Sequence, residues 1–385
     1  MDLPLIYLIA GEASGDVLGG RLMAALLARR PGLRFAGIGG ERMAEHGLVS
    51  RFPMRELALM GLLEILPNII ALRRRLGETV ADIAAHRPAV VVTIDSPGFT
   101  LRVLRAIAPL GLPRAQYVAP QVWAWRPRRV RHYGGLWERL LCLLPFEPAF
   151  FARHHLPATF VGHPVLESGA DAGDATRFRV RHGLASDTTV LTVMPGSRRT
   201  EVTRMLPVFE AALRLVATRV PGLAPVVPLA GPVAASVAAA TRHWPTRPIL
   251  VDTAADKHDA FAASAAALTK SGTSTLELAM AGVPMLVSHR ANPISVAIMR
   301  RTVTVRYLSI LNLIAEREIV PELLQEACTP QRIAAALVPL LTDPAAAAAQ
   351  RSACRAVLAQ LAPPQGTPSD AAAAEVLALL DGHRR

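Results

Sequence analysis

The sequence has few cysteines, few aromatic residues and almost no lysine. Its three cysteines, Cys142, Cys328 and Cys354, lie far apart and are odd in number. They therefore fit neither a disulfide framework nor a zinc-binding motif, and they indicate a reducing compartment. Only two of the 42 basic residues are lysines, Lys257 and Lys270, so arginine supplies most of the net charge of +12. Aromatic residues make up 5% and no nucleic-acid-binding motif is present, so we expect lipid or phosphate partners and no nucleic acid.

A signal peptide and a membrane-spanning segment are also missing from the pattern. The amino terminus lacks a basic region, and its apolar run ends at Ala10, which is typical of a first strand. The apolar segment 57–72 is interrupted by Glu64 and Pro67 and is too short to span a bilayer. Three arginines at 73–75 follow it, so it is typical of a helix lying in a membrane interface. A buried core helix with a basic C-terminus fits the same residues.

The remaining pattern is that of a two-domain α/β protein. The chain has 385 residues, of which 51% are hydrophobic and 19% charged, enough for two or three domains with large cores. Runs typical of buried strands lie at 5–10, 35–40, 90–94, 116–118, 140–144, 190–194, 226–229, 249–251, 265–269 and 284–288. They alternate with helical stretches on both sides of a small polar segment at 168–174, which we interpret as a linker. We predict doubly wound domains at 1–168 and 175–362, and a last helix within 363–385 that could pack back on the first domain.

Residues 270–284 connect two of these strands through a hydroxyl-rich turn and a helix. Gly272 permits a tight turn, and the hydroxyl residues at 273–275 are candidate N-caps. The N-terminus of such a helix offers N–H groups and a positive dipole end to a diphosphate, and Glu277 lies one turn further on, where a carboxylate could reach a ribose. An ordinary turn with a capping box from Ser274 to Glu277 explains the same residues.

Asp95 is the candidate general base, because it directly follows the predicted strand 90–94 and ligands bind at that edge of parallel sheets. Asp95 could equally cap the Asp-Ser-Pro turn in which it stands. No D-x-D pair lies at a strand end, where such a pair would bind Mg²⁺ on a diphosphate, so we predict no metal and no cofactor. Arg198, Lys270 and the helix N-terminus at 272–275 can supply positive charge to a leaving diphosphate instead.

Eight motifs in one order carry a family resemblance across nearly the whole chain. They are AGEASGD (10–16), TIDSPGF (93–99), YVAPQVWAW (117–125), LPFE (144–147), FVGHPV (160–165), MPGSRRTE (194–201), SGTSTLELAMAGVPM (271–285) and NLIAEREIVPELLQ (312–325). Together they resemble the lipid-A-disaccharide synthases, glycosyltransferase family 19. The resemblance implies a GT-B fold, with two Rossmann-like domains facing across a cleft, and catalysis without metal.

The same resemblance implies the substrates and the location. The expected reaction joins UDP-2,3-diacylglucosamine to 2,3-diacylglucosamine 1-phosphate (lipid X) in a β-1,6 linkage and releases UDP. The expected location is peripheral, on the cytoplasmic face of the inner membrane, where the anionic lipid surface would be a partner.

Site residues follow from the motifs and from the patterns above. Asp95 resembles the family's essential aspartate, with His163 and Glu12 in reserve. Expected nucleotide-sugar contacts are Gly196, Ser197, Arg198, Lys270, Ser271, Gly272, Thr273, Ser274, Thr275, Glu277, Asn312 and Glu316. Expected acceptor and membrane contacts are Ser14, Asp16, Met60, Leu62, Leu63, Ile65, Arg73 and Arg74. The chain departs from the family pattern at 312–318, where Glu316 stands in a position that we expect to be glycine.

Two other classes of function fit parts of the pattern. One is another GT-B enzyme that uses UDP-GlcNAc, either a cell-wall transferase or a 2-epimerase, and the apolar segment 57–72 and the turn at 10–16 count against it. The other is a non-catalytic basic protein on nucleic acid or membrane, which would bind DNA with a steep salt dependence and would not bind UDP.

Overall fold

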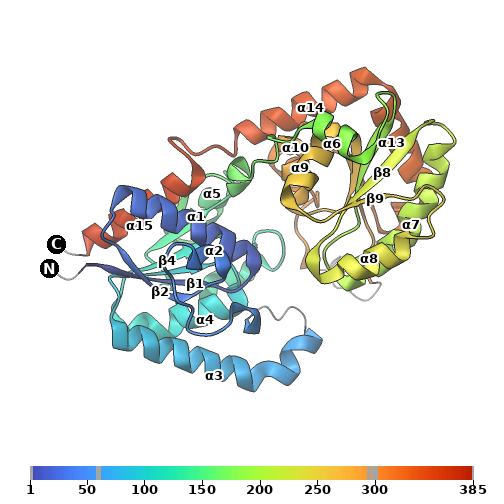
Figure 1. The fold of residues 1–385 in the computed structure, drawn as a ribbon. Coiled ribbons are helices and arrows are strands. Elements are labelled where there is room, and N and C mark those ends of the chain that lie inside the picture. The colour runs from blue at the N-terminus through green and yellow to red at the C-terminus, as the bar shows by residue number, and fades with distance from the viewer. Residues whose placement is uncertain (1–2, 58–61, 293–295, 297–301, 384–385) are drawn as a thin grey trace. The chain divides into compact units, whose positions relative to one another are not determined.

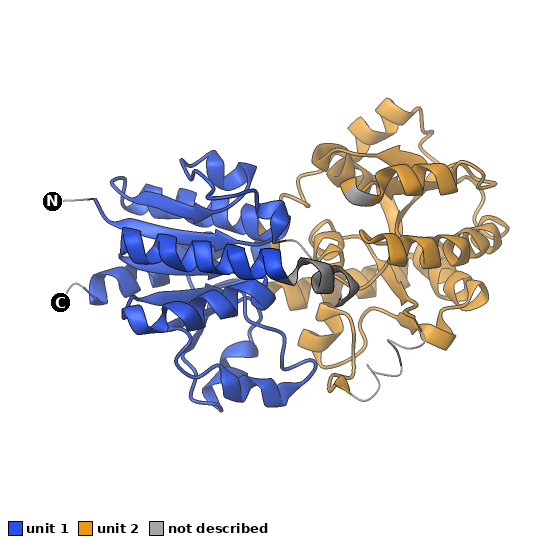
Figure 2. Ribbon diagram, turned by 90° about the horizontal axis from the view of Figure 1, so that it is seen from below, with its two compact units in different colours: residues 1–164, 361–385 blue, residues 165–360 orange. Residues whose placement is uncertain are grey.

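The structure, a computed structural model, describes residues 3–57, 62–292, 296 and 302–383. The chain forms two compact units, shown in different colours in Figure 2. Unit 1 contains residues 1–164 and 361–385, and unit 2 contains residues 165–360. Each unit is built around a parallel sheet of six strands covered by helices, so the predicted fold class of two doubly wound α/β units is confirmed.

The sheet of unit 1 has the strand order β2-β1-β3-β4-β5-β6 (Figure 1). Its strands are β1 (Leu5–Ala10), β2 (Arg34–Ile38), β3 (Val90–Ile94), β4 (Arg114–Tyr117), β5 (Arg139–Cys142) and β6 (Ala158–Phe160). The chain places β2 on one side of β1 and then β3 on the other side. The strand order therefore reverses between β1 and β3, and ligands of open α/β sheets bind at the carboxyl ends of such a strand pair.

Helices cover both faces of this sheet. They are α1 (Ala13–Arg29), α2 (Glu41–Ala44), α3 (Leu62–His86), α4 (Pro97–Ile107), α5 (Glu147–Ala152) and α15 (Pro368–Gly382). Because side chains alternate along a strand, Ile6 and Leu8 of β1 pack in the same core cluster as α1 and α15. Tyr7 and Ile9 pack in a second cluster with α3 and α4. The C-terminal helix α15 is therefore part of the core of unit 1.

Unit 2 repeats the arrangement with the strand order β12-β11-β10-β7-β8-β9. Its strands are β7 (Thr189–Met194), β8 (Leu223–Pro228), β9 (Ile249–Val251), β10 (Ser264–Thr269), β11 (Met285–His289) and β12 (Glu322–Leu324). Here the chain moves outward from β7 to β9 and then returns to place β10 on the other side of β7. The order reverses between β7 and β10, and their carboxyl ends form the ligand-binding edge.

The helices of unit 2 also pack on both faces of its sheet. They are α6 (Ala175–His182), α7 (Arg199–Ala217), α8 (Ala234–Thr241), α9 (Ala254–Ala263), α10 (Ser274–Met280), α12 (Ile310–Ala315), α13 (Pro330–Thr342) and α14 (Pro344–Ala359). Leu191 and Val193 of β7 share a core cluster with α7 and α13. Val190 lies in a separate cluster with α6 and α9, on the opposite face.

The segment 168–174 is not a linker in the structure. The boundary between the units falls between Pro164 and Val165, and residues 168–174 belong to unit 2. A side chain at Gly173 would overlap the backbone oxygen of His258, so this backbone lies directly against α9. The next residue, Asp174, caps α6 and donates its backbone N–H to Asp259 at 2.8 Å. Small and polar residues are needed here for close packing and capping, which the sequence pattern does not distinguish from a linker.

Helix α3 contains residues 62–72 of the apolar segment 57–72 and continues to His86. From Leu72 onward the helix packs in the core of unit 1, since Leu76 and Val80 contact the cluster that contains Ile83. Ile70, two residues before Leu72, is 79% exposed. Among the described residues no single helix is long and apolar enough to cross a membrane. Helices α13 and α14, bent by 94° at their junction, are together long and apolar enough, by length and composition alone.

Candidate active site

The turns after β7 and β10 meet at the point where the strand order of unit 2 reverses. Met194 and Thr269 are paired in register, and Lys270 donates its backbone N–H to Met194 at 3.2 Å. The Lys270 ammonium lies 2.8 Å from Oε1 of Glu201, in the first turn of α7. The predicted residues at 196–198 and 270–274 are therefore brought together by strand pairing.

Glu201 contacts both of these turns, although the sequence analysis assigned it no role. Its Oε2 accepts the backbone N–H groups of Ser197 and Arg198, each at 3.3 Å. Gly196, at φ +126°, allows this contact because a side chain there would meet the same carboxylate. Burial alone would raise the pKa of Glu201, but the hydrogen bond and charge of Lys270 hold it below its usual value. Glu201 is thus an anion that orients Lys270 and the 196–198 turn.

The helix after β10 begins as predicted, but its first turn is stabilised differently. Thr273 is the N-cap of α10 and makes no side-chain capping hydrogen bond, so the alternative of a capping box from Ser274 to Glu277 is wrong. Thr275 instead donates its hydroxyl to Gly272 at 2.7 Å. The Glu277 carboxylate accepts from the Lys257 ammonium, at 3.1 Å to Oε1 and 3.0 Å to Oε2.

Asn312 does not offer its side chain to a ligand. It is fully buried, its Nδ2 donates to Val320 and Glu322, and its Oδ1 accepts the N–H groups of Ile319 and Val320. An amide has two N–H donors and two acceptor lone pairs, so no polar valence remains. Asn312 therefore does not make the side-chain contact with the nucleotide that the resemblance implies, and instead holds the backbone at 319–320 and the side chain of Glu322.

That support reaches the predicted site through one loop. Glu322 accepts the N–H groups of Leu308 and Ser309, each at 2.8 Å, and Leu308 accepts the Ser271 hydroxyl at 2.8 Å. Asn312 thus helps to place Ser271. Glu316 ends α12 in a left-handed conformation at φ +53° and is exposed. The expected glycine would fit this backbone better, because it has no Cβ.

In unit 1 Asp95 lies at the corresponding reversal of strand order. Ala10 and Ile94 are paired in register, so the turn at Gly11 and Glu12 lies beside the turn at Asp95. Asp95 and Ser96 both have left-handed backbones, with φ of +49° and +45°. Burial raises the pKa of the Asp95 carboxyl, although the N–H of Ser96 opposes the shift. A carboxylate with a raised pKa at a ligand-binding edge is suited to accept a proton.

The other candidates of unit 1 differ in what their side chains can reach. Glu12 is the half-buried N-cap of α1, and Ser14 is exposed in its first turn. The Asp16 carboxylate is buried and accepts the N–H groups of Gly40, Arg42 and Met43, at 2.7–3.1 Å. Asp16 therefore fixes the start of α2, whereas the exposed side chain of Ser14 can contact a ligand.

His163 is buried, and burial lowers its pKa to about 4, so the imidazole is neutral at physiological pH. Glu147, which sequence reasoning left without a role, is also buried. It accepts the Trp123 indole N–H and the N–H groups of Leu143 and Leu144, each at 3.0 Å. These bonds oppose burial, which raises the pKa of Glu147 to about 7, and they tie the Trp123 loop to the end of β5.

The expected membrane contacts are only partly described. Met60 lies outside the described residues. Leu62, Leu63 and Ile65 lie on the first turns of α3. Arg73 and Arg74 are exposed, with Arg74 3.6 Å from Glu78, whereas the less exposed Arg75 is bound more closely to Glu56 and Glu78, at 2.7 and 2.6 Å.

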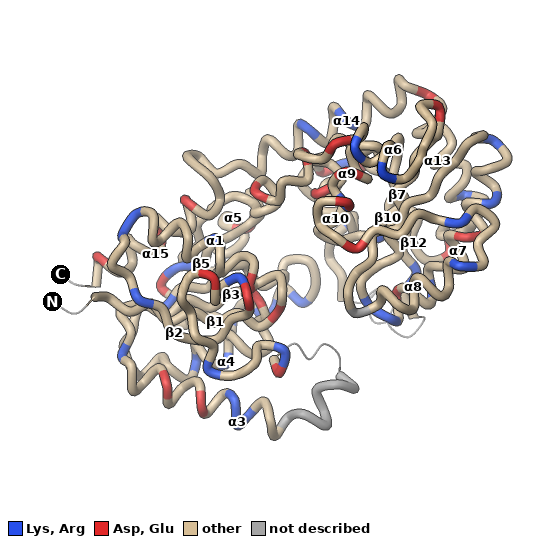
Figure 3. The backbone as a smooth tube through the Cα atoms, in the orientation of Figure 1, with Lys and Arg blue, Asp and Glu red and all other residues tan. Residues whose placement is uncertain are grey.

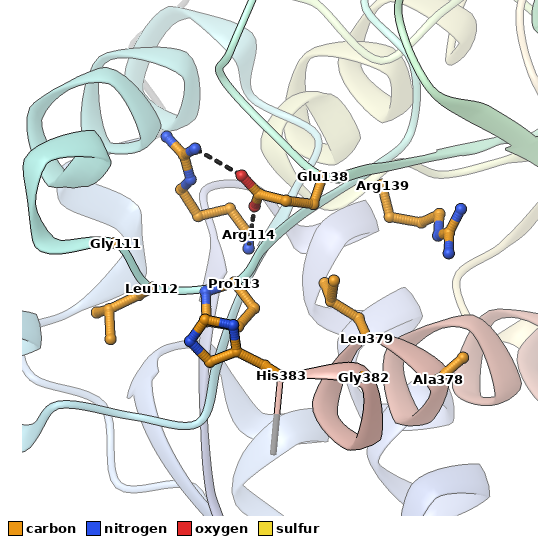
Figure 4. Close-up of a pocket in the computed structure, with 10 residues that line it drawn as sticks. All are labelled: Gly111, Leu112, Pro113, Arg114, Glu138, Arg139, Ala378, Leu379, Gly382 and His383. Carbon is orange, nitrogen blue, oxygen red and sulfur yellow. Dashed lines mark hydrogen bonds and ion pairs between the residues drawn. The ribbon is translucent and has the colours of Figure 1, made fainter. Parts of the chain in front are cut away.

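A cavity of about 350 Å³ lies at the opposite edge of unit 1 (Figure 4). It is formed where the amino ends of β4 and β5 meet the end of α15. Arg114 and Glu138 are bound to each other at 2.7 Å on its wall. We assign it no part in the site, because ligands of parallel sheets bind at the carboxyl edge. Across the described ranges no three His, Cys, Asp or Glu side chains gather as metal ligands would.

Comparison with known proteins decides the family. Residues 6–376 match the family model described as lipid-A-disaccharide synthetase. The chain belongs to the lipid-A-disaccharide synthetase family. The lipid-A-disaccharide synthase of Granulibacter bethesdensis is 57% identical over 99% of this chain and 100% of its own length. That of Gluconobacter oxydans is 54% identical over 98% of this chain and 91% of its own length. Membership makes the protein an enzyme, a glycosyltransferase of lipid A biosynthesis.

Solved structures support the fold. A putative UDP-N-acetylglucosamine 2-epimerase from Listeria monocytogenes has a TM-score of 0.62 at 14% identity, covering 100% of this chain and 97% of its own. The glycotransferase of kitacinnamycin has a TM-score of 0.63 at 19% identity, covering 98% of this chain and 99% of its own. At this identity the likeness concerns the fold alone, and it agrees with the GT-B architecture expected for a lipid-A-disaccharide synthetase.

Proposed function

We propose that the protein transfers the sugar of UDP-2,3-diacylglucosamine to lipid X and releases UDP. The new bond joins C1 of the donor to the 6-oxygen of the acceptor, while the bond from C1 to the diphosphate breaks. The proton of the 6-hydroxyl leaves to a base, and the diphosphate departs as an anion. The observation that carries this proposal is family membership over residues 6–376, together with the polar residues at the reversals of strand order in each unit.

The donor would bind at the reversal in unit 2. Glu277 would accept the two ribose hydroxyls, and Ser271, Gly272, Thr273 and Ser274 would lie along the diphosphate. Support comes from the pairing of β7 with β10, which brings Arg198 and Lys270 to the same edge. These two cations and the N-terminus of α10 would compensate the charge of departing UDP.

The acceptor would meet Asp95 in unit 1. Its position after β3 and its raised pKa support the role of general base. His163 is a weaker candidate because an imidazole with a pKa of about 4 has little affinity for a proton. Glu12 and Ser14, on the neighbouring turn, would contact the acceptor.

The second substrate class is lipid, and we propose that α3 brings the enzyme to it. Exposed Ile70, Arg73 and Arg74 together suit an anionic lipid surface. The location that follows is peripheral, on the cytoplasmic face of the inner membrane. Leu62, Leu63 and Ile65, earlier on the same helix, would belong to the same contact.

The test is incubation with UDP-2,3-diacylglucosamine and lipid X, with the product read by mass. We expect a disaccharide 1-phosphate and one UDP per disaccharide, with turnover unchanged by excess EDTA because Arg198 and Lys270 take the place of a cation. Loss of turnover in EDTA, restored by Mg²⁺, would contradict the charge compensation. Conversion of UDP-GlcNAc to its 2-epimer without disaccharide would support the epimerase alternative instead.

A further inference from the structure

Both lysines of this arginine-rich chain form ion pairs with glutamates in unit 2. Lys270 binds Glu201, and Lys257 binds Glu277 through both carboxylate oxygens. Lys257 lies in the first turn of α9, and Glu277 lies in the first turn of α10. Each side chain of the Lys257–Glu277 pair is 24% exposed, so the pair is accessible from solvent without being fully hydrated.

The helix that carries Lys257 is itself held in place from its other side. Arg177 of α6 forms two hydrogen bonds to Asp259, at 2.6 and 2.5 Å, and Arg181 is paired with Asp256. Figure 3 shows acidic and basic positions side by side where α6, α9 and α10 meet. The Lys257 ammonium also lies over the Phe261 ring, with Nζ 5.8 Å from the ring centroid. Lys257 therefore extends from a fixed helix toward Glu277.

We propose that Lys257 is a positioning residue for nucleotide recognition, which holds the Glu277 carboxylate in the orientation that accepts ribose hydroxyls. This inference rests on the proposed function of Glu277 in the donor site. Each carboxylate oxygen can accept more than one hydrogen bond, so Lys257 and a ribose can share Glu277. A glutamate side chain loses rotamer freedom when it is immobilised, and a carboxylate already held by an ammonium has lost that freedom before the ligand arrives.

The expected signature is selective for the ribose. Wild-type protein should bind UDP more tightly than 2′-deoxy-UDP, because the deoxy sugar leaves Glu277 without one hydroxyl partner. Lys257→Met keeps an unbranched apolar side chain and removes the charge. We expect Lys257→Met to weaken UDP binding by about tenfold while 2′-deoxy-UDP binding changes much less, since the ordering of Glu277 must then occur on binding. Lys257→Arg should restore most of the preference.

Titration calorimetry with both nucleotides tests the proposal, with folding checked by thermal melting. Arg214→Met is the matched control, because it breaks an exposed pair with Glu210 on α7 and should leave both affinities unchanged. A folded Lys257→Met protein that keeps the wild-type preference, or that binds UDP more tightly, would overturn the inference. Equal weakening of both nucleotides would also overturn it, because that result indicates general damage to the site.

Glu277→Gln separates this inference from the proposed function on which it rests. If Glu277→Gln loses the preference for UDP and Lys257→Met keeps it, the donor site stands and only the role of Lys257 fails. If Glu277→Gln itself keeps the preference, the ribose role of Glu277 and the inference fail together. In the expected case the double variant should be no weaker than Glu277→Gln alone, because Lys257 acts through that carboxylate.

Discussion

Asp95 combines a left-handed backbone with a partly buried carboxyl at the edge of the unit 1 sheet. Asp95→Asn should lower kcat by roughly 10²–10⁴ and leave UDP affinity intact, because asparagine cannot take a proton and the donor residues lie in unit 2. Because burial raises its pKa, the charged form is disfavoured and Asn should not lower the melting temperature. Steady-state kinetics and UDP calorimetry check this, and a parallel fall in UDP affinity would make Asp95 structural.

The same carboxyl sets a pH dependence of activity. With its folded pKa raised, Asp95 is protonated over a range in which an ordinary aspartate is ionised. The value of kcat/KM should therefore fall with decreasing pH through a point above the normal aspartate pKa of about 3.9. Glu12→Gln should keep this acid limb. If Glu12→Gln removes the limb, the base is Glu12 and not Asp95.

His163 should make the stability of unit 1 sensitive to acid. Its folded pKa of about 4 lies below the unfolded value of 6.5, so its contribution is complete above pH 6.5 and is lost as pH falls toward 4. The free energy of unfolding should decrease by up to about 3 kcal/mol over that range. His163→Gln should flatten this dependence in urea unfolding followed by tryptophan fluorescence. Exposed His132→Gln is the control and should retain it.

Glu316 occupies the position where the family pattern expects glycine, and its backbone has a left-handed conformation that disfavours a side chain. At φ +53° a side chain with a Cβ is strained. Glu316→Gly should raise the free energy of unfolding by about 1 kcal/mol, since glycine adopts this backbone without the strain of a Cβ. Glu316→Ala is the control, because alanine keeps the Cβ and should bring no gain in denaturant unfolding. An equal gain from both variants would remove the backbone explanation.

The sequence analysis found the polar residues that directly follow strands. It missed the residues whose role depends on a contact with a side chain distant in the sequence. Asp95, Lys270 and Ser271 follow predicted strands directly, so their place at a sheet edge follows from alternation alone. The role of Glu201 depends on its distance to Lys270, which is 69 residues further along the chain. The scarcity of lysine was the one sequence signal that pointed to Lys257, because no local motif contains it.

At the scale of elements, α3 packs in the core of unit 1 from Leu72 onward, and its residues Ile70, Arg73 and Arg74 are exposed. Replacing Ile70 with Ser and Arg73 and Arg74 with Gln should release the protein from anionic vesicles. Each basic residue near such a surface contributes about 1 kcal/mol, so the two arginines alone account for roughly thirtyfold in partitioning. Vesicle sedimentation measures this, and Leu62, Leu63 and Ile65 replaced by Ser should act in the same direction. Unchanged binding by a folded variant would place the membrane contact elsewhere.

Arg75→Gln is the matched control for this helix. Arg75→Gln removes one positive charge, as a change at Arg74 does, but Arg75 is bound to Glu56 and Glu78. Its loss should therefore mainly lower the stability of the fold and have a smaller effect on vesicle binding. Equal effects of Arg75 and Arg74 on partitioning would show that only net charge matters.

Most helices and strands could be predicted from the hydrophobic pattern and the length of each run. The predictions failed for two very short strands and for one segment interpreted as a linker. The buried strands β1, β3, β7 and β10 are continuous apolar runs, which identify parallel strands covered on both faces. Strands β6 and β12 have three residues each and contain polar residues, Thr159 in β6 and Glu322 in β12, whereas the equally short β9 is entirely apolar and was predicted. The segment 168–174 was predicted as a linker because capping and close packing use the same small and polar residues as linkers do.

At the scale of the whole molecule, unit 1 is discontinuous in sequence. Helix α15 contributes Ala372, Ala373, Val376 and Leu380 to the core cluster that contains β1. Ion pairs link α15 to α1 and β5, with Arg29 bound to Asp370, Arg30 to Asp381 and Arg139 to Glu375. The sequence pattern identified this helix and suggested that it could pack back on the first domain, but it did not indicate which elements the helix contacts, because an alanine-rich helix carries no mark of the face on which it packs.

Unit 2, in contrast, is one continuous segment from 165 to 360. Among the described residues, its core clusters contain none of unit 1, and the proposed donor residues from Gly196 to Glu277 all belong to it. A fragment of residues 165–360 should therefore fold with a cooperative thermal transition and bind UDP as tightly as the full chain, while transferring no sugar because Asp95 is absent. The complementary fragment 1–164 should be unstable, since it lacks α15.

Calorimetry with UDP on the 165–360 fragment measures the first expectation, and Glu277→Gln in the same fragment is its control. A folded fragment that fails to bind UDP would mean that unit 1 contributes to the donor site. In that case Asp95→Asn in the full chain should also weaken UDP binding, so the fragment and the point variant must agree. The two measurements together decide whether donor recognition and proton removal are divided between the units.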